Sequence, residues 1–553
     1  MTKKTKLELT WPGKEERPRL EPRILIEDPA KSYHAKVRRE GDIFDNMLIK
    51  GDNLLALKAL EQDYAGKVKC VFIDPPYNTG SAFEHYDDGL EHSLWLSLIR
   101  DRLEIIKRLL SDQGSLWITI DDNEAHYLKV ICDEVFGRVN FVTDITWHKR
   151  ISPANDAKYF SADADHILVY ARSKEAWSPN RSARTEAQSA YYKNLDDDPR
   201  GPWNSSAYTC AKSAEERPNL YYPIVNPNTN KEIWPSKTRV WAYGPETHAR
   251  NVADNLVYWG KDGRGTMPRI KKFLSETKLV VPRSIWGHDE AGHNQESKIE
   301  IERLFPGNPF GTPKPERLLK KVVEISTRPG DLVLDSFAGS GTTGAVAHKM
   351  GRRWIMVEIG EHAETHVLPR LQKVIDGTDQ GGISKAVDWK GGGGFRYFAL
   401  APSLLEQDRY GNWVIAKDYN PAMLAEAMCK HMGFTYAPAS DPQEYWRHGS
   451  STETDFIYVT TQALTHEACT KISHDVGPDR SLLICCKAFD ADADAFDNLT
   501  LVKIPTSILQ KCEWGRDDYS LNIQNLPEAD DAAEEIQAMT IGLPLFAGEA
   551  GDE

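Results

Sequence analysis

Short apolar runs alternate with longer amphipathic stretches along residues 46–174. Runs such as KVKCVFID, GSLWITID and HILVYAR have the length of buried strands. Between them, SLWLSLIRDRLEIIKRLL places apolar residues three and four positions apart, which is the spacing of one helix face. In NMLIKGDNLLALKAL, a strand and a Gly-Asp-Asn turn precede a helix with Leu54, Leu57 and Leu60 on one side. This alternation predicts a mostly parallel sheet covered by helices.

The alternation stops near Lys174 and resumes after about Glu300. The segment between is rich in Pro, Asn, Trp and Tyr and has weak periodicity, which indicates a separate, loop-rich insert. Beyond it, DLVLD and RWIMVE predict strands, KPERLLKKVVEIST and GTTGAVAHKM predict helices, and WKGGGGFRYF predicts a flexible joint. The expected parts are an N-terminal arm at 1–45, two halves of one α/β domain at 46–174 and 301–390, an insert at 175–300, a C-terminal domain at 391–525 and an acidic tail at 526–553.

Composition adds constraints on class and compartment. The chain has 553 residues, of which 40% are hydrophobic, and no apolar run approaches the ~20 residues that cross a bilayer. The charged N-terminus lacks a signal peptide, and the eight cysteines form no CxxC pair. We therefore expect a cytoplasmic protein with reduced thiols, no membrane contact and no metal site.

The charge is unevenly distributed. The net charge of −14 argues mildly against a nucleic-acid partner. Residues 201–300, however, contain 14 Lys and Arg against 11 Asp and Glu, whereas all charged residues of 527–553 are acidic. The middle of the chain is therefore the part that can tolerate phosphates.

The stretch VFIDPPYNTG, at 71–80, interrupts a hydrophobic strand with an acid and two prolines. Proline ends regular hydrogen bonding, so Asp74, Pro75, Pro76 and Tyr77 must leave the strand as a rigid turn. A carboxylate and an aromatic ring fixed at the end of a buried strand indicate a functional site.

A second motif lies in DLVLDSFAGSGTTGAVAHKMGRRWIMVEIG. Gly339, Gly341 and Gly344 follow a strand and open a helix, where they permit a tight turn and close approach of a ligand to the helix N-terminus. Glu358 ends the next strand, where a carboxylate can accept both hydroxyl protons of a ribose. The strand, glycine loop, helix and terminal acid together predict a site for a nucleoside-containing cofactor.

The acid Asp335 ends the strand before these glycines, and Phe337 lies between them. A carboxylate at this position repels a pyrophosphate but suits the cationic sulfonium and amino groups of S-adenosylmethionine. The charge of Asp335 therefore favours S-adenosylmethionine over NAD, and it disfavours an NAD-dependent oxidoreductase.

DPPYNTG together with DSFAGSGTT resembles the amino-group DNA methyltransferases of the β class, in which DPPY precedes FxGxG. GDNLLALKAL and WKGGGGFRY extend the similarity to the modification (Mod) subunit of type III restriction–modification systems, over about 40–400. The resemblance implies a Rossmann-like, S-adenosylmethionine-dependent methyltransferase domain with circularly permuted motif order, an inserted target-recognition domain and a mixed α/β C-terminal domain. It further implies double-stranded DNA as substrate, a homodimer, and a restriction (Res) helicase–nuclease subunit as a partner of 391–525.

The resemblance assigns catalysis to Asp74, Pro75, Pro76 and Tyr77. The Asp74 carboxylate and the Pro75 carbonyl would accept the two N–H groups of an adenine N6 amine, so that the nitrogen lone pair faces the methyl donor. Tyr77 would stack on the base once it is flipped out of the duplex. Aspartate as the first residue resembles the adenine N6 group, because the cytosine N4 enzymes more often carry serine there.

The resemblance also implies a set of cofactor-binding residues, namely Asp335, Phe337, Gly339, Gly341, Thr342 and Glu358. Asp52 and Asn53 are in reach of the cofactor's adenine, but helix capping by Asn53 explains them nearly as well. Lys314, followed by Pro315, matches a family motif near the methionine end of the cofactor, and a plain helix start explains it equally well.

The insert at 175–300 is the expected target-recognition domain. Its candidate contacts to phosphates or guanine edges are Lys237, Arg239, Arg264, Arg269, Lys271 and Lys272. Each of these side chains is individually more simply explained as a solvated charge.

Three alternatives stay open beside an adenine-specific enzyme. A cytosine N4 methyltransferase shares the motifs. A protein glutamine methyltransferase uses a similar Pro-Pro-Tyr turn, but it usually carries Asn first and lacks a large insert. An inactive DNA-binding module shares the fold, and the intact Asp74, Tyr77, Asp335 and Glu358 argue against it.

Overall fold

A computed structural model of the chain describes residues 8–520 except for 78–81, 84–85, 88–91, 154–157, 183, 185–188 and 278. The chain forms two compact units: unit 1 comprises Met1–Ser178 and Arg283–Glu553, and unit 2 comprises Pro179–Pro282. Every helix of the described residues is too short or too polar to span a bilayer. The acidic tail expected at 526–553 lies outside the described residues.

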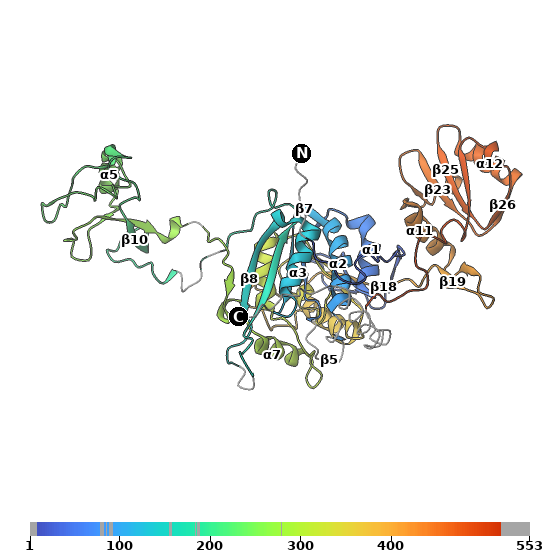
Figure 1. The fold of residues 1–553 in the computed structure, drawn as a ribbon, viewed down its shortest axis with the longest axis horizontal. Helices are drawn as coiled ribbons and strands as arrows, with labels where there is room; N and C mark the ends of the chain where they lie inside the picture. Colours follow the sequence, from blue (N-terminus) through green and yellow to red (C-terminus); the bar gives the residue numbers. More distant parts are fainter. Residues whose placement is uncertain are drawn as a thin grey trace, which may run out of the picture. The chain divides into compact units, whose positions relative to one another are not determined.

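Unit 1 is built on an 11-stranded sheet (Figure 1). The strands from β18 to β7 run parallel to their neighbours, as the sequence predicts, whereas β1, β2 and β9 pair antiparallel. In spatial order the strands are β1 (Leu25–Glu27), β18 (Gly394–Leu400), β3 (Asn46–Lys50), β17 (Arg353–Glu358), β16 (Leu332–Asp335), β4 (Val68–Ile73), β7 (Leu110–Ile120), β9 (Ala164–Ala171), β8 (Phe141–His148) and β15 (Ile285–Trp286), with β2 (Tyr33–His34) beside β18.

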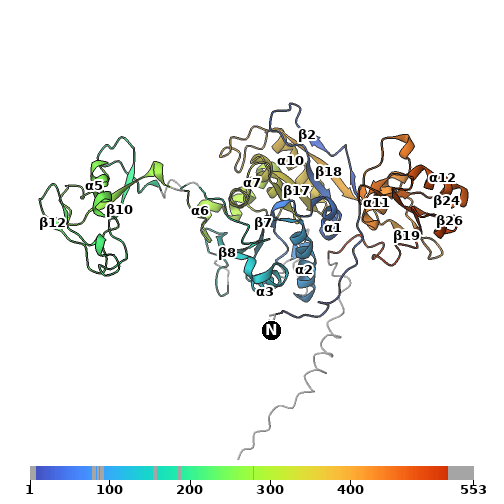
Figure 2. The same ribbon diagram turned by 90° about the horizontal axis from the view of Figure 1, so that it is seen from above.

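Helices cover both faces of this sheet. The helices α1 (Asn53–Tyr64), α2 (His92–Leu109) and α3 (Ala125–Cys132) lie side by side in Figure 1, and their apolar residues share one buried cluster with the sheet. A second cluster takes residues from the other sheet face and from α8 (Glu316–Ser326), α9 (Thr342–Lys349) and α10 (Leu368–Ile375), the last of which lies near β17 in Figure 2. The result is a three-layer α/β/α domain.

The two sequence motifs meet at the centre of the sheet because β4 and β16 are neighbours. The chain leaves β4 toward α2 on one face and leaves β16 toward α9 on the other. A crevice opens at the carboxyl ends of two adjacent strands when their connections diverge in this way, and ligands bind there in open α/β sheets. This topology places residues 74–77 beside the glycine loop after β16.

Several boundaries differ from those expected. Part of the arm expected at 1–45 belongs to the main sheet, because β1 and β2 pair with β18. Gly394–Leu400, expected as a joint and the start of the C-terminal domain, is the strand β18 inside the main sheet. Residues 283–300 belong to unit 1, where β15 pairs with β8. These strands are short and pair with partners distant in sequence, so local periodicity does not predict them.

The region after β18 has the mixed α/β composition that the sequence predicts. Most of its buried apolar residues fill two further clusters, one of which also contains Ile24. Its elements are a five-stranded sheet of β21 (Thr435–Tyr436), β22 (Gly449–Ser450), β23 (Asp455–Val459), β25 (Ser481–Cys486) and β27 (Leu499–Lys503), the strand pairs β19 (Leu405–Gln407) with β20 (Trp413–Ile415) and β24 (Ala463–Thr465) with β26 (Ala488–Asp490), and the helices α11 (Pro421–Met432) and α12 (His466–Val476).

Unit 2 has a small aromatic core formed by Tyr208, Ile224, Trp241, Trp259 and Ile270. Around it lie a three-stranded sheet of β10 (Trp203–Ala207), β14 (Arg269–Phe273) and β13 (Val257–Tyr258), the pair β11 (Ile224–Val225) with β12 (Glu232–Ile233), and the helix α5 (Pro245–Ala253).

Candidate active site

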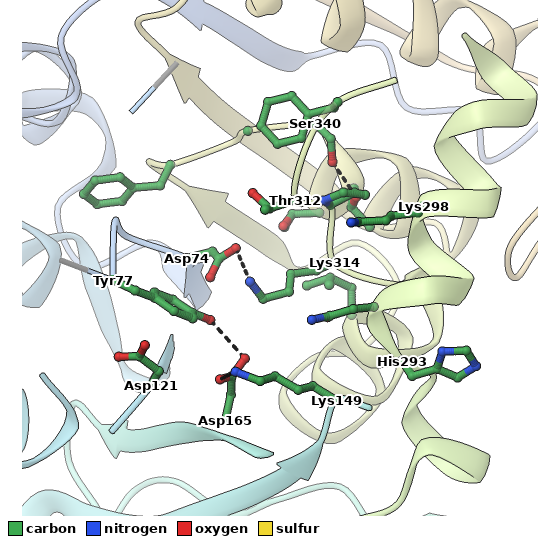
Figure 3. Close-up of a pocket in the computed structure, with 18 of the residues that line it drawn as sticks. Asp74, Tyr77, Asp121, Lys149, Asp165, His293, Lys298, Thr312, Lys314 and Ser340 are labelled. Carbon is green, nitrogen blue, oxygen red and sulfur yellow. Dashed lines mark hydrogen bonds and ion pairs between the residues drawn. The ribbon is translucent and has the colours of Figure 1, made fainter. Parts of the chain in front are cut away.

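The turn at residues 74–77 leaves the carboxyl end of β4 and is fixed by the core beneath it. The indole nitrogen of Trp95, a fully buried residue of α2, donates a 2.8 Å hydrogen bond to the Pro76 carbonyl oxygen. The two prolines restrict the backbone of the turn further. Asp74 and Tyr77 are therefore carried on a rigid support, and both side chains face the same cavity (Figure 3).

Both oxygens of the Asp74 carboxylate have partners from distant parts of the chain. The hydroxyl of Thr119, on the neighbouring strand β7, donates to Oδ1 at 2.5 Å. The ammonium of Lys314, just before α8, lies 2.5 Å from Oδ2. The carboxylate is thus held in one orientation by a neutral donor and a cation.

Tyr77 contacts a second ion pair. Its hydroxyl donates to Oδ2 of Asp165 at 3.5 Å, and Oδ1 of Asp165 accepts a 2.5 Å bond from Lys149. Burial, together with the Asp165 and Asp74 carboxylates, raises the pKa of Tyr77 well above its ordinary value. The phenol therefore stays neutral at physiological pH and presents an uncharged ring.

The glycine loop between β16 and α9 needs its glycines. Gly339 and Gly341 have φ of +52° and +76°, in the left-handed region that favours glycine. A Cβ atom on Gly341 would also lie 2.9 Å from Cγ1 of Val367. The Gly339 N–H donates to Oε2 of Glu358 at 2.7 Å, so the acid at the end of β17 fixes the loop directly.

The two acids predicted for the cofactor have different electrostatics. Desolvation raises the pKa of Asp335 to about 7, although Thr343 and the Phe337 N–H donate hydrogen bonds to its carboxylate at 2.6 and 2.9 Å. Burial also acts to raise the pKa of Glu358, but contacts with His362 and two backbone N–H groups outweigh it and lower that pKa. Glu358 is therefore more fully ionised than Asp335 at neutral pH.

A cavity of about 840 Å³ connects the turn to the glycine loop. This size suits a small-molecule ligand. Its wall includes nine of the predicted residues: Asp74, Pro75, Pro76, Tyr77, Lys314, Asp335, Phe337, Gly339 and Thr342. Four further predicted residues are not among the described residues that line it: Asp52, Asn53, Gly341 and Glu358.

The expected cap of α1 is corrected by the structure. Asp52, not Asn53, is the N-cap, and its Oδ1 accepts from the N–H groups of Leu54 and Leu55 at 2.9 and 3.0 Å. Asn53 instead donates a 2.7 Å bond to the Ser336 carbonyl, which links α1 to the glycine loop. Asp52 is 2% exposed, and its other oxygen accepts from the Tyr519 N–H at 3.0 Å. Its carboxylate is thus used for structure.

Thr119, Lys149 and Asp165 line or support the site, and the sequence did not identify them. Thr119 lies near the carboxyl end of β7, next to the end of β4. Asp165 lies at the amino end of β9, which reaches the same sheet edge because β9 runs antiparallel to β7. If β9 ran parallel to β7, Asp165 would lie at the opposite edge of the sheet.

The candidate DNA-contacting residues of the insert differ in whether they are exposed to solvent. Lys271 is 4% exposed and forms ion pairs with Asp196 and Asp198, so it is not available to a phosphate and the expectation for it is corrected. Burial hides this charge within the unit 2 sheet. The other five side chains are exposed: Lys237, Arg239, Arg264, Arg269 and Lys272.

Comparison with known proteins places the site in a family. Residues 68–368, more than half of the chain, match a family model described as DNA methylase. This range begins at β4 and ends at the start of α10, so it contains the turn, the glycine loop and unit 2.

Two similar relatives are both named as Mod subunits of type III restriction-modification enzymes. "Probable type III restriction-modification enzyme HindVI Mod subunit" of Haemophilus influenzae is 31% identical over 415 residues, covering 66% of this chain and 55% of the relative. "Type III restriction-modification enzyme StyLTI Mod subunit" of Salmonella typhimurium is 36% identical over 327 residues, covering 54% of this chain and 49% of the relative. The chain spans about half the length of these relatives. Among solved structures, PvuII DNA methyltransferase (cytosine-N4-specific) aligns with a TM-score of 0.34 and 14% identity, over 64% of this chain and 94% of that chain.

Proposed function

Because the chain belongs to the DNA methylase family, we propose that it transfers a methyl group from S-adenosylmethionine to the N6 amine of adenine in double-stranded DNA, at a specific sequence. The observation that carries this proposal is the single cavity that joins the Asp74–Tyr77 turn to the glycine loop. The cavity thus brings an acceptor for an amine next to a cradle for a nucleoside cofactor.

The residues of the cavity fit S-adenosylmethionine, which supplies an electrophilic methyl group on its sulfonium sulfur. Gly339 lines the cavity with a φ of +52°, which favours glycine, and without a side chain its backbone is accessible to a ligand. Phe337, Thr342 and Asp335 line the same cavity. Glu358, which fixes the loop through the Gly339 N–H, is the candidate ribose acceptor.

The target amine would be prepared by the turn. Asp74 Oδ2 and the Pro75 carbonyl accept its two N–H groups, which withdraws the nitrogen lone pair from the purine ring. Thr119 holds the other oxygen of Asp74, so the acceptor is preorganised. The Asp74 carboxylate then takes the proton that the amine loses. Tyr77 stacks its neutral ring on the flipped base.

We extend the proposal to the assembly. The names of the two relatives support a modification subunit of a type III restriction–modification system. On that basis the motif order is circularly permuted, unit 2 serves as the inserted target-recognition domain, the protein acts in the cytoplasm, and the C-terminal region mediates a homodimer and contact with a Res helicase–nuclease subunit.

Methyl transfer from labelled cofactor into plasmid DNA tests the proposal. We expect label in N6-methyladenine, and label only in N4-methylcytosine or in protein would refute it. Asp74→Ala should retain cofactor binding and lose at least ~1000-fold in transfer rate, because the amine loses its charged acceptor. Asp112→Ala, an exposed acid on β7, is the matched control and should transfer normally. Retained transfer by Asp74→Ala would remove Asp74 from the mechanism.

A further inference from the structure

The Lys314 ammonium occupies the place on Asp74 where the target amine is expected. It lies 2.5 Å from Asp74 Oδ2 and 5.0 Å from the centre of the Tyr77 ring, so it contacts both residues assigned to the base (Figure 3). The pair is largely shielded from water, with side-chain exposures of 12% for Lys314 and 22% for Asp74. Shielding strengthens the ion pair relative to one on the surface.

This contact opposes the proposed reaction in two ways. The Lys314 ammonium competes with the amine for Oδ2, while Thr119 already uses Oδ1. The amine nitrogen also becomes cationic as its bond to the methyl carbon forms, and a neighbouring ammonium disfavours that charge. Lys314 must therefore leave Asp74 before the amine can react.

The other described carboxylates of the cavity already have hydrogen-bond or ion-pair partners. Among them, burial raises the pKa of Asp165, and Lys314 is close enough for its charge to act to lower that pKa. The Asp165 carboxylate pairs with Lys149, and the Asp335 carboxylate accepts from Thr343 and the Phe337 N–H. The Asp121 carboxylate accepts from Asn123. An additional anion without a partner in the cavity would come from a ligand. S-adenosylmethionine carries one, the carboxylate of its methionine part.

The backbone allows such an exchange. Pro315, with φ of −68°, is the N-cap of α8, whose buried face anchors it to the core. The lysine side chain has a four-carbon flexible stem and moves without a backbone change. Lys314 can therefore reorient while the turn and the glycine loop stay in place.

We propose that Lys314 is a positioning residue that guards Asp74. Without cofactor, the Lys314 ammonium neutralises the Asp74 carboxylate. When S-adenosylmethionine binds, its own carboxylate attracts the ammonium away from Asp74, so that Asp74 accepts the target amine only in the cofactor-loaded protein. This inference rests on the proposed function of the cavity. It identifies the amino-acid end of the cofactor as the trigger for an ordered reaction, with cofactor before base.

Isothermal titration of the full chain with two probes tests the exchange without DNA. S-adenosylhomocysteine has the carboxylate and an uncharged sulfur, whereas 5′-methylthioadenosine lacks the amino-acid part. If Asp74 competes for Lys314, Asp74→Asn should bind S-adenosylhomocysteine about five- to tenfold more tightly than the wild type, the order expected for one partly shielded ion pair. The affinity for 5′-methylthioadenosine should not change.

Two further variants make the result specific. In Lys314→Gln, the affinity for S-adenosylhomocysteine should fall, and adding Asp74→Asn should no longer raise it. Asp112→Asn removes an exposed carboxylate of β7 that does not line the cavity, and it should leave the affinity unchanged. A structural role for Lys314 alone would not produce this coupling.

The outcomes separate the inference from the function on which it rests. Equal or weaker binding by Asp74→Asn, or the same gain in the Lys314→Gln background, would overturn the guarding role and leave the methyltransferase proposal intact. A wild-type chain that binds neither probe would contradict the proposed cofactor, and the guarding role with it.

Discussion

Asp335 carries a carboxylate that folding has removed from water. It is 2% exposed, and desolvation raises its pKa to about 7 from an ordinary value near 4. The folded protein therefore binds a proton at this site over a pH range in which the unfolded chain does not. Hydrogen bonds from Thr343 and Phe337 limit the shift and explain why a charged form is accessible at all.

This shift predicts a pH-dependent contribution to stability. A raised carboxylate pKa stabilises the folded state most below about pH 4 and loses that contribution as pH rises through about pH 7. Relative to Asp335→Asn, the wild type should lose about 1–3 kcal/mol of unfolding free energy between about pH 5 and pH 8. Urea unfolding of both proteins across this range measures it. A difference that does not vary with pH would contradict the raised pKa.

Gly341 tests the glycine loop at a single position. Alanine there meets two obstacles, a φ of +76° and a Cβ atom 2.9 Å from Val367. We expect Gly341→Ala to destabilise by about 2–4 kcal/mol and to weaken S-adenosylhomocysteine binding. Gly351→Ala is the matched control, because Gly351 has φ of +70° and a Cβ atom there would meet none of the described residues within 4 Å.

The control separates backbone strain from packing. Gly351→Ala should cost about 1 kcal/mol in urea unfolding and leave ligand affinity unchanged. Equal effects of the two substitutions would show that the contact with Val367 does not matter.

At the scale of elements, α8, α9 and α10 are joined by buried charges beneath the glycine loop. Arg370 of α10 donates to the Ser340 carbonyl at 3.2 Å and to the Thr342 hydroxyl at 2.8 Å, and it pairs with Glu316 of α8 at 3.0 Å. Lys349 of α9 also contacts Glu316, at 2.8 Å. These bonds fix the glycine loop relative to the three helices.

Arg370→Met should therefore affect both stability and binding. It leaves the buried Glu316 with one cation fewer and the loop without its support, so we expect a loss of about 3–5 kcal/mol in unfolding free energy and at least about tenfold weaker S-adenosylhomocysteine binding. Arg352→Met is the control, since the mostly buried Arg352 bonds to Thr327 and Met350, away from the loop. It should lose stability and keep its affinity, as judged by thermal melting and titration. Full affinity in Arg370→Met would show that Arg370 does not hold the glycine loop in its binding conformation.

At the scale of the whole molecule, unit 2 is a module whose two ends meet. Ser182 and Val280 exchange two backbone hydrogen bonds, of 3.0 and 2.8 Å, and the unit has its own aromatic core. An antiparallel pair of this kind can be closed by a short turn. Replacing 183–279 by Asn-Gly should then remove unit 2 without stretching the chain.

The shortened protein tests the division of labour. We expect it to bind S-adenosylhomocysteine with wild-type affinity and to lose methylation of specific DNA, because the cavity belongs to unit 1 and the exposed cations to unit 2. Titration and mapping of methylated bases measure the two properties. Methylation of the same sequence without unit 2 would place recognition elsewhere.

Particular residues show how far sequence reading reaches. The turn at Asp74 and the loop at Gly339 could be identified because their chemistry is local: prolines, glycines and strand-terminal acids follow one another in the chain. Thr119 and Asp165 could not, since each looks like an ordinary strand residue until β7 and β9 bring it to the edge where β4 ends. Lys271 shows the converse: the sequence makes it a candidate DNA contact, but the folded chain buries its ammonium in an ion pair.

The sequence by itself determined the alternation of strands and helices, the two motifs and the presence of a separate unit in the middle of the chain, because these depend on residue type and spacing along the chain. Only the tertiary structure decided that β1, β18 and β15 complete the sheet and that Lys314 contacts Asp74. Those features depend on contacts between residues up to hundreds of positions apart. Such contacts are selected by packing and electrostatics of the folded chain, and no local pattern encodes them.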